Sequence, residues 1–107
     1  MKIAVTATGG SMSAMLSEKF GRCQYFIIVD SETMKFEPVS NSSMDLAGGA
    51  GPAAARQISG LGATVLLTGS VGPNAVRALE AAGIKVEGGF SGDQTVREAV
   101  EKYLKKG

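Results

Sequence analysis

The chain has 107 residues, a common size for one domain with one hydrophobic core, and we predict a single domain over residues 1–107. A formal net charge of +1 and a charged fraction of 20% leave no basic or acidic excess, so we expect no nucleic acid and no membrane among its partners. One cysteine and no histidine exclude an internal disulfide and remove the commonest general base and metal ligand. No apolar run approaches the roughly 18 residues that span a bilayer, and no signal peptide precedes the first strand, so we expect a cytoplasmic protein.

The first half of the chain predicts three strands. Residues 2–8 (KIAVTAT) are almost continuously apolar, which is typical of a strand covered on both faces. Residues 24–30 (QYFIIVD) give the strongest strand signal, and residues 35–41 (KFEPVSN) alternate like a half-exposed strand. Pro38 cannot donate to a neighbouring strand, so this third strand is expected at the sheet edge. Residues 41–51 lack periodicity and contain three glycines, which predicts a mobile loop.

A repeat with a shift of 21 residues organises the second half, where GGAGPAAARQISGLGATV (48–65) is followed by GSVGPNAVRALEAAGIKV (69–86). Proline is favoured at the first helical position, so Pro52 and Pro73 predict two helix starts with the preceding glycines, Gly51 and Gly72, as N-caps. A glycine in the left-handed conformation ends each helix, and the strands 63–68 and 84–87 follow at once.

A capping box formed by Thr95 and Glu98 predicts a final helix. The element order is therefore β-β-β-α-β-α-β-α, which predicts a three-layer α/β/α domain with a five-stranded mixed sheet. The second strand is expected to run antiparallel to the first, whereas strands 35–41, 63–68 and 84–87 are candidates for parallel neighbours of the first strand.

This topology brings several glycine-rich segments to one edge of the sheet. The duplicated turns lie at the carboxyl ends of strands, and the antiparallel second strand begins at the same edge with Gly21, Arg22 and Cys23. Ligands bind at this edge in open α/β sheets, and helix N-termini attract anions. The repeat therefore predicts two helix N-termini beside the single thiol.

Three segments together resemble a known family: SEKFGRCQYFIIVD (17–30), GGAGPAAA (48–55) and TGSVGPNAVRALEAAGIKV (68–86). They are similar to the dinitrogenase iron-molybdenum cofactor biosynthesis family, the small nitrogenase accessory proteins, and the similarity extends from Lys2 to about Leu104. The resemblance implies a ribonuclease-H-like α/β/α fold. It also implies non-catalytic binding or carriage of an iron-sulfur or iron-molybdenum cofactor precursor, so we expect no enzyme.

The family motifs can be placed residue by residue. Ser17, Phe20, Gly21 and Arg22 match the S-x-x-F-G-R element, and the segment 72–74 matches the G-P-N turn. Many relatives carry histidines in the loop before the first helix, but this loop reads NSSMDLAGGAG and has none.

The predicted site joins these motifs to the glycine-rich sheet edge. Cys23 is the predicted metal ligand, because the adjacent Arg22 would favour its thiolate. A permanent four-iron cluster usually takes about four thiolates, so we expect a cluster that is carried rather than kept. We also expect the Cys23→Ser variant to lose its iron. The expected partners are a metal cluster or small anionic ligand and a protein that donates or accepts the cluster. The predicted cofactor-binding residues are Ser17, Phe20, Gly21, Arg22, Cys23, Gly49, Gly51, Gly69, Gly72 and Asn74.

Other interpretations of the same residues remain open. Backbone N–H groups alone can hold phosphate, so the alternative function is a binding module for a phosphate-bearing small molecule. A nuclease is disfavoured because the first strand carries no carboxylate for metal ions. Arg56 and Arg77 are typical of a solvated helix face. Thioethers from Met12, Met15 and Met44 could bind a soft metal, although methionine more often fills gaps in a core.

Overall fold

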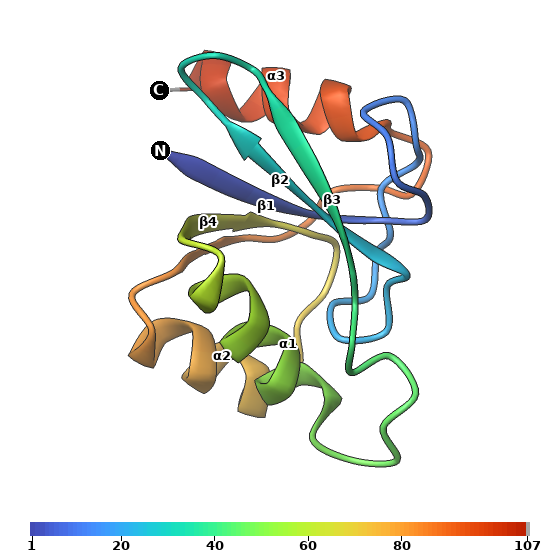
Figure 1. Cartoon of the computed structure of the whole chain (residues 1–107), viewed down its shortest axis with the longest axis vertical. Helices are drawn as coiled ribbons and strands as arrows, with labels where there is room; N and C mark the ends of the chain where they lie inside the picture. The colour runs from blue at the N-terminus through green and yellow to red at the C-terminus, as the bar shows by residue number, and fades with distance from the viewer. Residues whose placement is uncertain (107) are drawn as a thin grey trace.

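The computed structural model describes residues 1–106 and arranges them in three layers, with a mixed sheet between helices (Figure 1). The strands are β1 (Lys2–Ala7), β2 (Tyr25–Asp30), β3 (Phe36–Ser40), β4 (Ala63–Leu67) and β5 (Lys85–Glu87). The helices are α1 (Ala50–Gly60), α2 (Pro73–Ala81) and α3 (Val96–Lys106). The predicted three-layer fold with a five-stranded sheet is therefore confirmed. Gly107, the last residue of the predicted domain, lies outside the described residues.

The strand order is β3-β2-β1-β4-β5. β1 pairs antiparallel with β2 and parallel with β4, and β4 pairs parallel with β5. The two strands of the repeat, β4 and β5, are thus parallel neighbours. The expectation that β3 and β5 also lie next to β1 is wrong. β3 pairs antiparallel with β2, to which it is joined by a short connection, and β5 pairs with β4, to which it is joined through α2. Pro38 lies in this edge strand, as expected.

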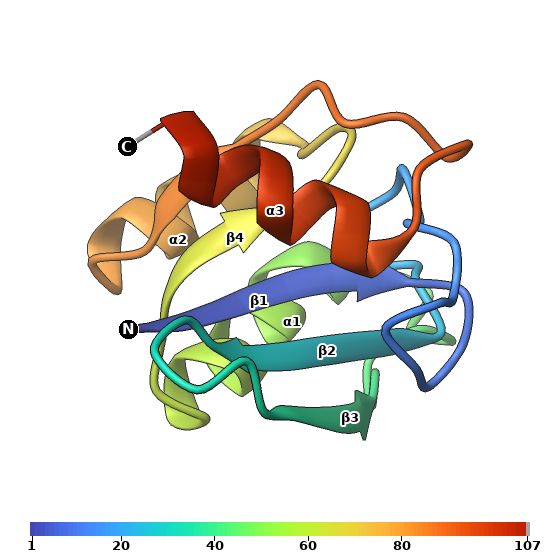
Figure 2. The ribbon, with the colours of Figure 1, turned by 90° about the horizontal axis from the view of Figure 1, so that it is seen from above.

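Alternation along the strands separates two cores (Figure 2). In β1, Ile3 and Val5 face the layer of α3, whereas Ala4 faces the layer of α1 and α2. In β2, Ile27 faces α3 and Phe26 faces the other two helices. Both faces of the central strands are therefore covered, which explains their continuous apolar sequence.

The two repeat helices begin differently. α2 begins at Pro73 with Gly72 as its N-cap, as predicted. α1 begins at Ala50 with Gly49 as its N-cap at φ 74°, two residues earlier than predicted. Ala50 is buried, which favours its inclusion in the helix, and proline is tolerated in the first turn because its missing N–H would have no intrahelical partner there.

The helix ends and the last capping box agree with the sequence. Gly62 and Gly83 adopt positive φ values of 86° and 75° directly after the two repeat helices. The backbone N–H of Thr95 donates to Glu98 Oε1 over 2.8 Å, and the N–H of Glu98 donates to Thr95 Oγ1 over 3.1 Å. Among residues 1–106, no helix has both the length and the apolar character needed to cross a membrane.

Candidate functional site

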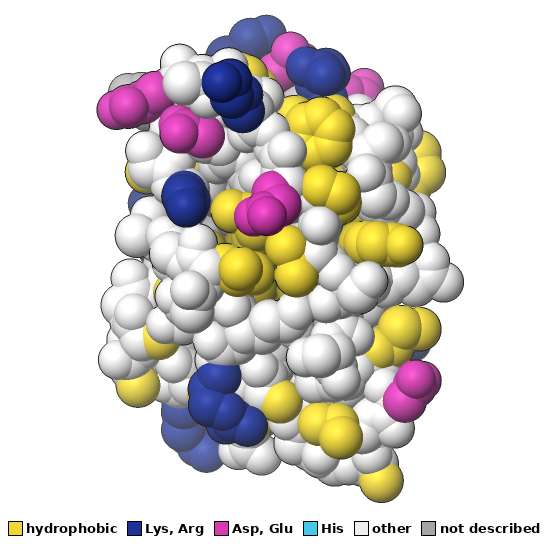
Figure 3. Space-filling model, in the orientation of Figure 1, with side chains coloured by type: hydrophobic (Ala, Val, Ile, Leu, Met, Phe, Trp, Pro, Cys, Tyr) yellow, Lys and Arg dark blue, Asp and Glu magenta, His cyan; other side chains and the backbone are white. Residues whose placement is uncertain are grey.

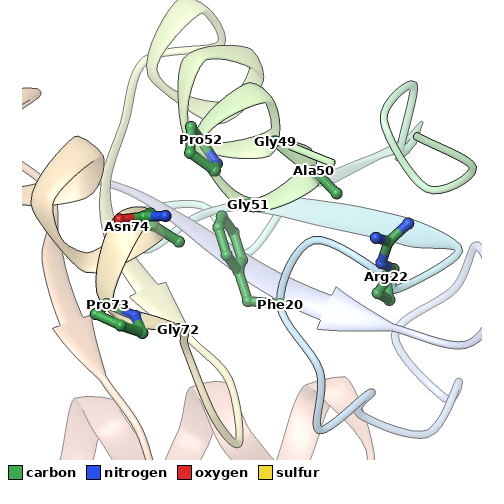
Figure 4. A pocket seen from close by; sticks show the side chains of 10 residues that line it. Phe20, Arg22, Gly49, Ala50, Gly51, Pro52, Gly72, Pro73 and Asn74 are labelled. Atoms are coloured by element: carbon green, nitrogen blue, oxygen red, sulfur yellow. The ribbon is translucent and has the colours of Figure 1, made fainter. Parts of the chain in front are cut away.

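A cleft of about 270 Å³ opens between the N-termini of α1 and α2 and the segment that precedes β2 (Figure 4). Phe20 and Gly51 lie at its centre, with Asn74 on one side and Arg22 on the other. The expected convergence of the duplicated turns with the motif around Arg22 is therefore observed. The complete lining is Phe20, Arg22, Gly49, Ala50, Gly51, Pro52, Gly72, Pro73, Asn74 and Ala75.

Glycines at two positions allow the segments around the cleft to approach one another closely. A Cβ atom on Gly51 would lie 2.7 Å from the Cβ of Ala75, so the first turn of α1 packs directly against that of α2. A Cβ atom on Gly21 would lie 3.2 Å from the Cα of Gly51, and Gly21 also has a positive φ of 88°. The floor of the cleft therefore requires glycine at both positions.

The cleft favours negative charge. Neither Gly49 nor Gly72 can cap its helix with a side chain, and neither helix has an acidic residue in its first turn. The first N–H groups of a helix have no intrahelical acceptor and carry a partial positive charge. Arg22 is the only charged side chain among the lining residues that the structure describes. Backbone donors and one guanidinium thus face the same space.

Arg22 is also attached to the loop that leads into α1. Its Nη1 donates to the carbonyl oxygen of Met44 over 2.9 Å and to that of Leu46 over 2.6 Å. The side chain therefore bridges the cleft and the exposed segment 44–49, which we call the strap.

The arginines of the repeat lie outside the cleft. Arg56 and Arg77 are exposed, as expected for a solvated helix face. On the face drawn in Figure 3, one group of basic side chains lies over the α1 and α2 layer and others lie at the opposite end, over α3. Arg77 Nη1 donates to Asn74 Oδ1 over 3.1 Å, so Arg77 orients the Asn74 side chain in the cleft wall.

Cys23 differs from its expected state. Its side chain is 1% exposed and packs in the core with Phe20 and Phe26. Burial raises the pKa of Cys23 to about 12, despite an amide hydrogen bond from Asn41 that acts in the opposite direction, so the thiol is protonated at neutral pH. The expected thiolate is therefore disfavoured by burial, and the Arg22 guanidinium donates to the strap carbonyls instead. Metal ligation by Cys23 stays a prediction and would require the enclosed sulfur to be uncovered.

Three further predicted residues do not line the cleft. The backbone N–H of Ser17 donates to the carbonyl oxygen of Thr6, and the Thr6 hydroxyl donates to the carbonyl oxygen of Ser17. Gly21 lies under the cleft floor, as described above. Gly69 packs against Glu18, where an added Cβ would lie 2.6 Å from the Glu18 carbonyl oxygen. The remaining predicted residues, Phe20, Arg22, Gly49, Gly51, Gly72 and Asn74, all line the cleft.

Four lining residues were not predicted as site residues. Pro52 was recognised only as a helix start, and Pro73 as a helix start within the G-P-N turn. Ala50 and Ala75 carry no chemical signal in the sequence. Their part in the cleft follows from the position of the two helix N-termini. No group of three or more His, Cys, Asp or Glu side chains within residues 1–106 is placed to hold a metal ion. Met12 is buried in the core beside α3, as the gap-filling interpretation expected.

Solved structures of similar proteins share this fold. The apo form of the orange protein from Desulfovibrio gigas is 46% identical, with 98% of this chain and 88% of that chain covered and a TM-score of 0.95. The Thermotoga protein TM1290, of the DUF35 family, is 38% identical, with 97% and 87% covered and a TM-score of 0.83. PH0822, which is 23% identical with a TM-score of 0.83 and 99% and 92% covered, supports the fold alone.

None of the curated proteins compared with the chain matches it. Residues 1–106 match the protein family described as dinitrogenase iron-molybdenum cofactor. The chain therefore belongs to the dinitrogenase iron-molybdenum cofactor family.

Proposed function

We propose that the protein binds a preassembled iron-sulfur or iron-molybdenum cofactor precursor in the cleft and carries it, without catalysis, to an acceptor protein. The observation that carries this proposal is the lining itself, in which backbone N–H groups and Arg22 face the cleft without an acidic side chain. Sulfide-rich clusters are anionic, and such donors stabilise anions without forming metal–protein bonds. Membership of a cofactor-related family supports the same class of ligand.

The donor set favours a cargo over a resident cofactor. A permanent cluster usually takes about four cysteine thiolates, whereas this chain has one thiol, which is buried and protonated. Contacts through hydrogen bonds alone leave the metal–sulfide core of the cluster intact when it departs. The similar orange protein was solved in an apo form, which fits a separable ligand.

A phosphate-bearing small molecule remains the alternative ligand. The burial of Cys23 favours this alternative more than the sequence did, because an anion site of amides and one arginine needs no thiol. The two ligands differ in what the protein should retain after gel filtration: iron and sulfide in one case, and neither in the other.

Anaerobic reconstitution with iron and sulfide, with and without molybdate, tests the proposal. We expect the wild-type protein to retain iron and sulfide through gel filtration and to show charge-transfer absorption. Arg22→Gln should lose most of this load, whereas Arg56→Gln, which removes an exposed arginine outside the cleft, should keep it. A wild type without iron, or with the same load in Arg22→Gln, would contradict the proposal.

Cys23→Ala separates the two ways of holding a cluster. The cleft proposal expects this variant to keep its load, because the sulfur does not line the cleft. Loss of iron from a folded Cys23→Ala protein would instead support ligation by the thiol and would require the core around it to open.

A further inference from the structure

The backbone of Arg22 is held on both sides by one buried amide. The side chain of Asn41 is 7% exposed, and its Nδ2 donates to the carbonyl oxygens of Gly21 and Cys23 over 3.0 and 2.9 Å. These are the residues directly before and after Arg22. Asn41 therefore fixes the turn from which the guanidinium extends.

The oxygen of the same amide is attached to the base of the strap. Asn41 Oδ1 accepts hydrogen bonds from the backbone N–H of Ser43 over 3.0 Å and from its hydroxyl over 2.8 Å. The Ser43 hydroxyl also lies 3.2 Å from the carbonyl oxygen of Ala50, to which it can donate in turn. The Asn41–Ser43 pair thus connects the Arg22 turn to the first residue of α1.

The guanidinium is held at its far end as well. Nη1 is occupied by the strap carbonyls of Met44 and Leu46, whereas Nε and Nη2 of Arg22 have no hydrogen-bond partner among residues 1–106. This leaves one edge of the fork with two parallel N–H groups. Such an edge matches an anion with two adjacent acceptor atoms.

We infer that Asn41 and Ser43 are positioning residues that hold Arg22 ready to bind an anion through two adjacent acceptor atoms, as in a tetrahedral oxyanion or the sulfide edge of a cluster. The inference rests on the proposed function of the cleft as an anion site. A free arginine side chain would lose conformational entropy on binding, and a fixed one has already lost it. Removing the Asn41 amide should therefore weaken anion binding about tenfold without removing any direct contact.

Titration with inorganic phosphate at constant ionic strength, followed by NMR shifts of cleft amides, tests this inference in the wild type, Asn41→Ala, Arg22→Gln and the double variant. We expect saturable binding by the wild type and weaker binding by each single variant. The double variant should bind no more weakly than Arg22→Gln alone, because Asn41 acts through Arg22. A purely structural role would not produce this dependence.

Val100→Ala is the matched control for lost stability. Val100 is fully buried in the core on the other face of the sheet, so its truncation should lower stability and leave phosphate binding unchanged. Ser43→Ala replaces Asn41→Ala if the latter does not fold, and it should weaken binding in the same direction. The inference is overturned if the wild type does not bind, if the Asn41 variant binds as the wild type does, if the losses multiply, or if Val100→Ala weakens binding equally.

The outcome is separable from that of the proposed function. A wild type that binds phosphate with the expected coupling but retains no iron would refute cluster carriage and leave the positioning roles intact. A wild type that retains iron but shows no coupling between Asn41 and Arg22 would support cluster carriage and refute the positioning roles.

Discussion

Gly51→Ala tests whether the close approach of α1 and α2 shapes the cleft. The new Cβ would lie 2.7 Å from the Cβ of Ala75, whereas carbon atoms in contact prefer about 3.5–4.0 Å, so the two helix N-termini must separate by about 1 Å. Overpacking of this kind costs about 1–3 kcal/mol, and the better helix propensity of alanine offsets less than about 1 kcal/mol. We therefore expect a net loss of about 1–2 kcal/mol in the free energy of unfolding, with a wider cleft.

Gly60→Ala provides the control within the same helix. Gly60 is the last residue of α1, and an added Cβ there meets nothing within 4 Å, so we expect about 0.5–1 kcal/mol of added stability. Urea unfolding followed by circular dichroism gives both free energies, and anaerobic gel filtration gives the iron load. Gly51→Ala should lose load while Gly60→Ala keeps it. Equal stability of the two variants, or a full load in Gly51→Ala, would refute the packing argument.

Two further outcomes follow from the buried thiol and the strap. The pKa of Cys23 rises from near 9 to about 12 in the folded protein, so its contribution to stability is complete below about pH 9 and is lost towards pH 12. Between about pH 8 and pH 10, the wild type should lose about 1.4 kcal/mol more stability than Cys23→Ala, and parallel pH curves would contradict this. Amides of residues 44–49 should exchange with solvent faster than those of β4, and faster still in Arg22→Gln, because Arg22 holds the strap. Unchanged exchange in that variant would show that the strap is held by other contacts.

The sequence predicted the location of the cleft because its elements depend on local signals. Gly72 and Pro73 start a helix through their own backbone preferences, and the parallel order of the repeat strands follows from the helical crossover through α2. Together these signals place the helix N-termini and the Arg22 turn at one edge of the sheet. Among the helix starts, only that of α1 was misplaced, because the burial of Ala50 depends on tertiary packing.

Side-chain directions at the cleft could not be predicted in the same way. Cys23 and Arg22 are adjacent in sequence, yet the thiol packs beside Phe20 and Phe26 while the guanidinium reaches carbonyl groups about twenty residues later in the chain. Asn41 is an ordinary polar residue after a strand until the fold brings the Gly21 turn to its amide. These roles come from contacts between distant segments, on which single-sequence periodicity carries no information.

The helices α1 and α2, whose N-termini line the cleft, lack a stabilising feature that α3 has. α3 begins with a complete capping box between Thr95 and Glu98, whereas α1 and α2 begin at Gly49 and Gly72 without side-chain caps. An acidic cap would satisfy the exposed N–H groups, but it would also place its own carboxylate where an anion is expected to bind. The missing caps are therefore consistent with donors kept free for a ligand.

Gly72→Asp tests this trade of stability against binding. Gly72 has φ −70° and ψ 161°, which suits an N-cap aspartate, and an added Cβ meets nothing within 4 Å. We expect the free energy of unfolding to rise by about 0.5–1 kcal/mol. Phosphate binding and the iron load should both fall, because the carboxylate would occupy the N–H donors of the anion site and repel an anionic ligand. Gly72→Asn separates the two causes, since it caps the helix without a charge and should weaken binding less. If Gly72→Asp bound phosphate as the wild type does, the N-terminus of α2 would not face the ligand, and the anion would have to be held by Arg22 and α1 alone.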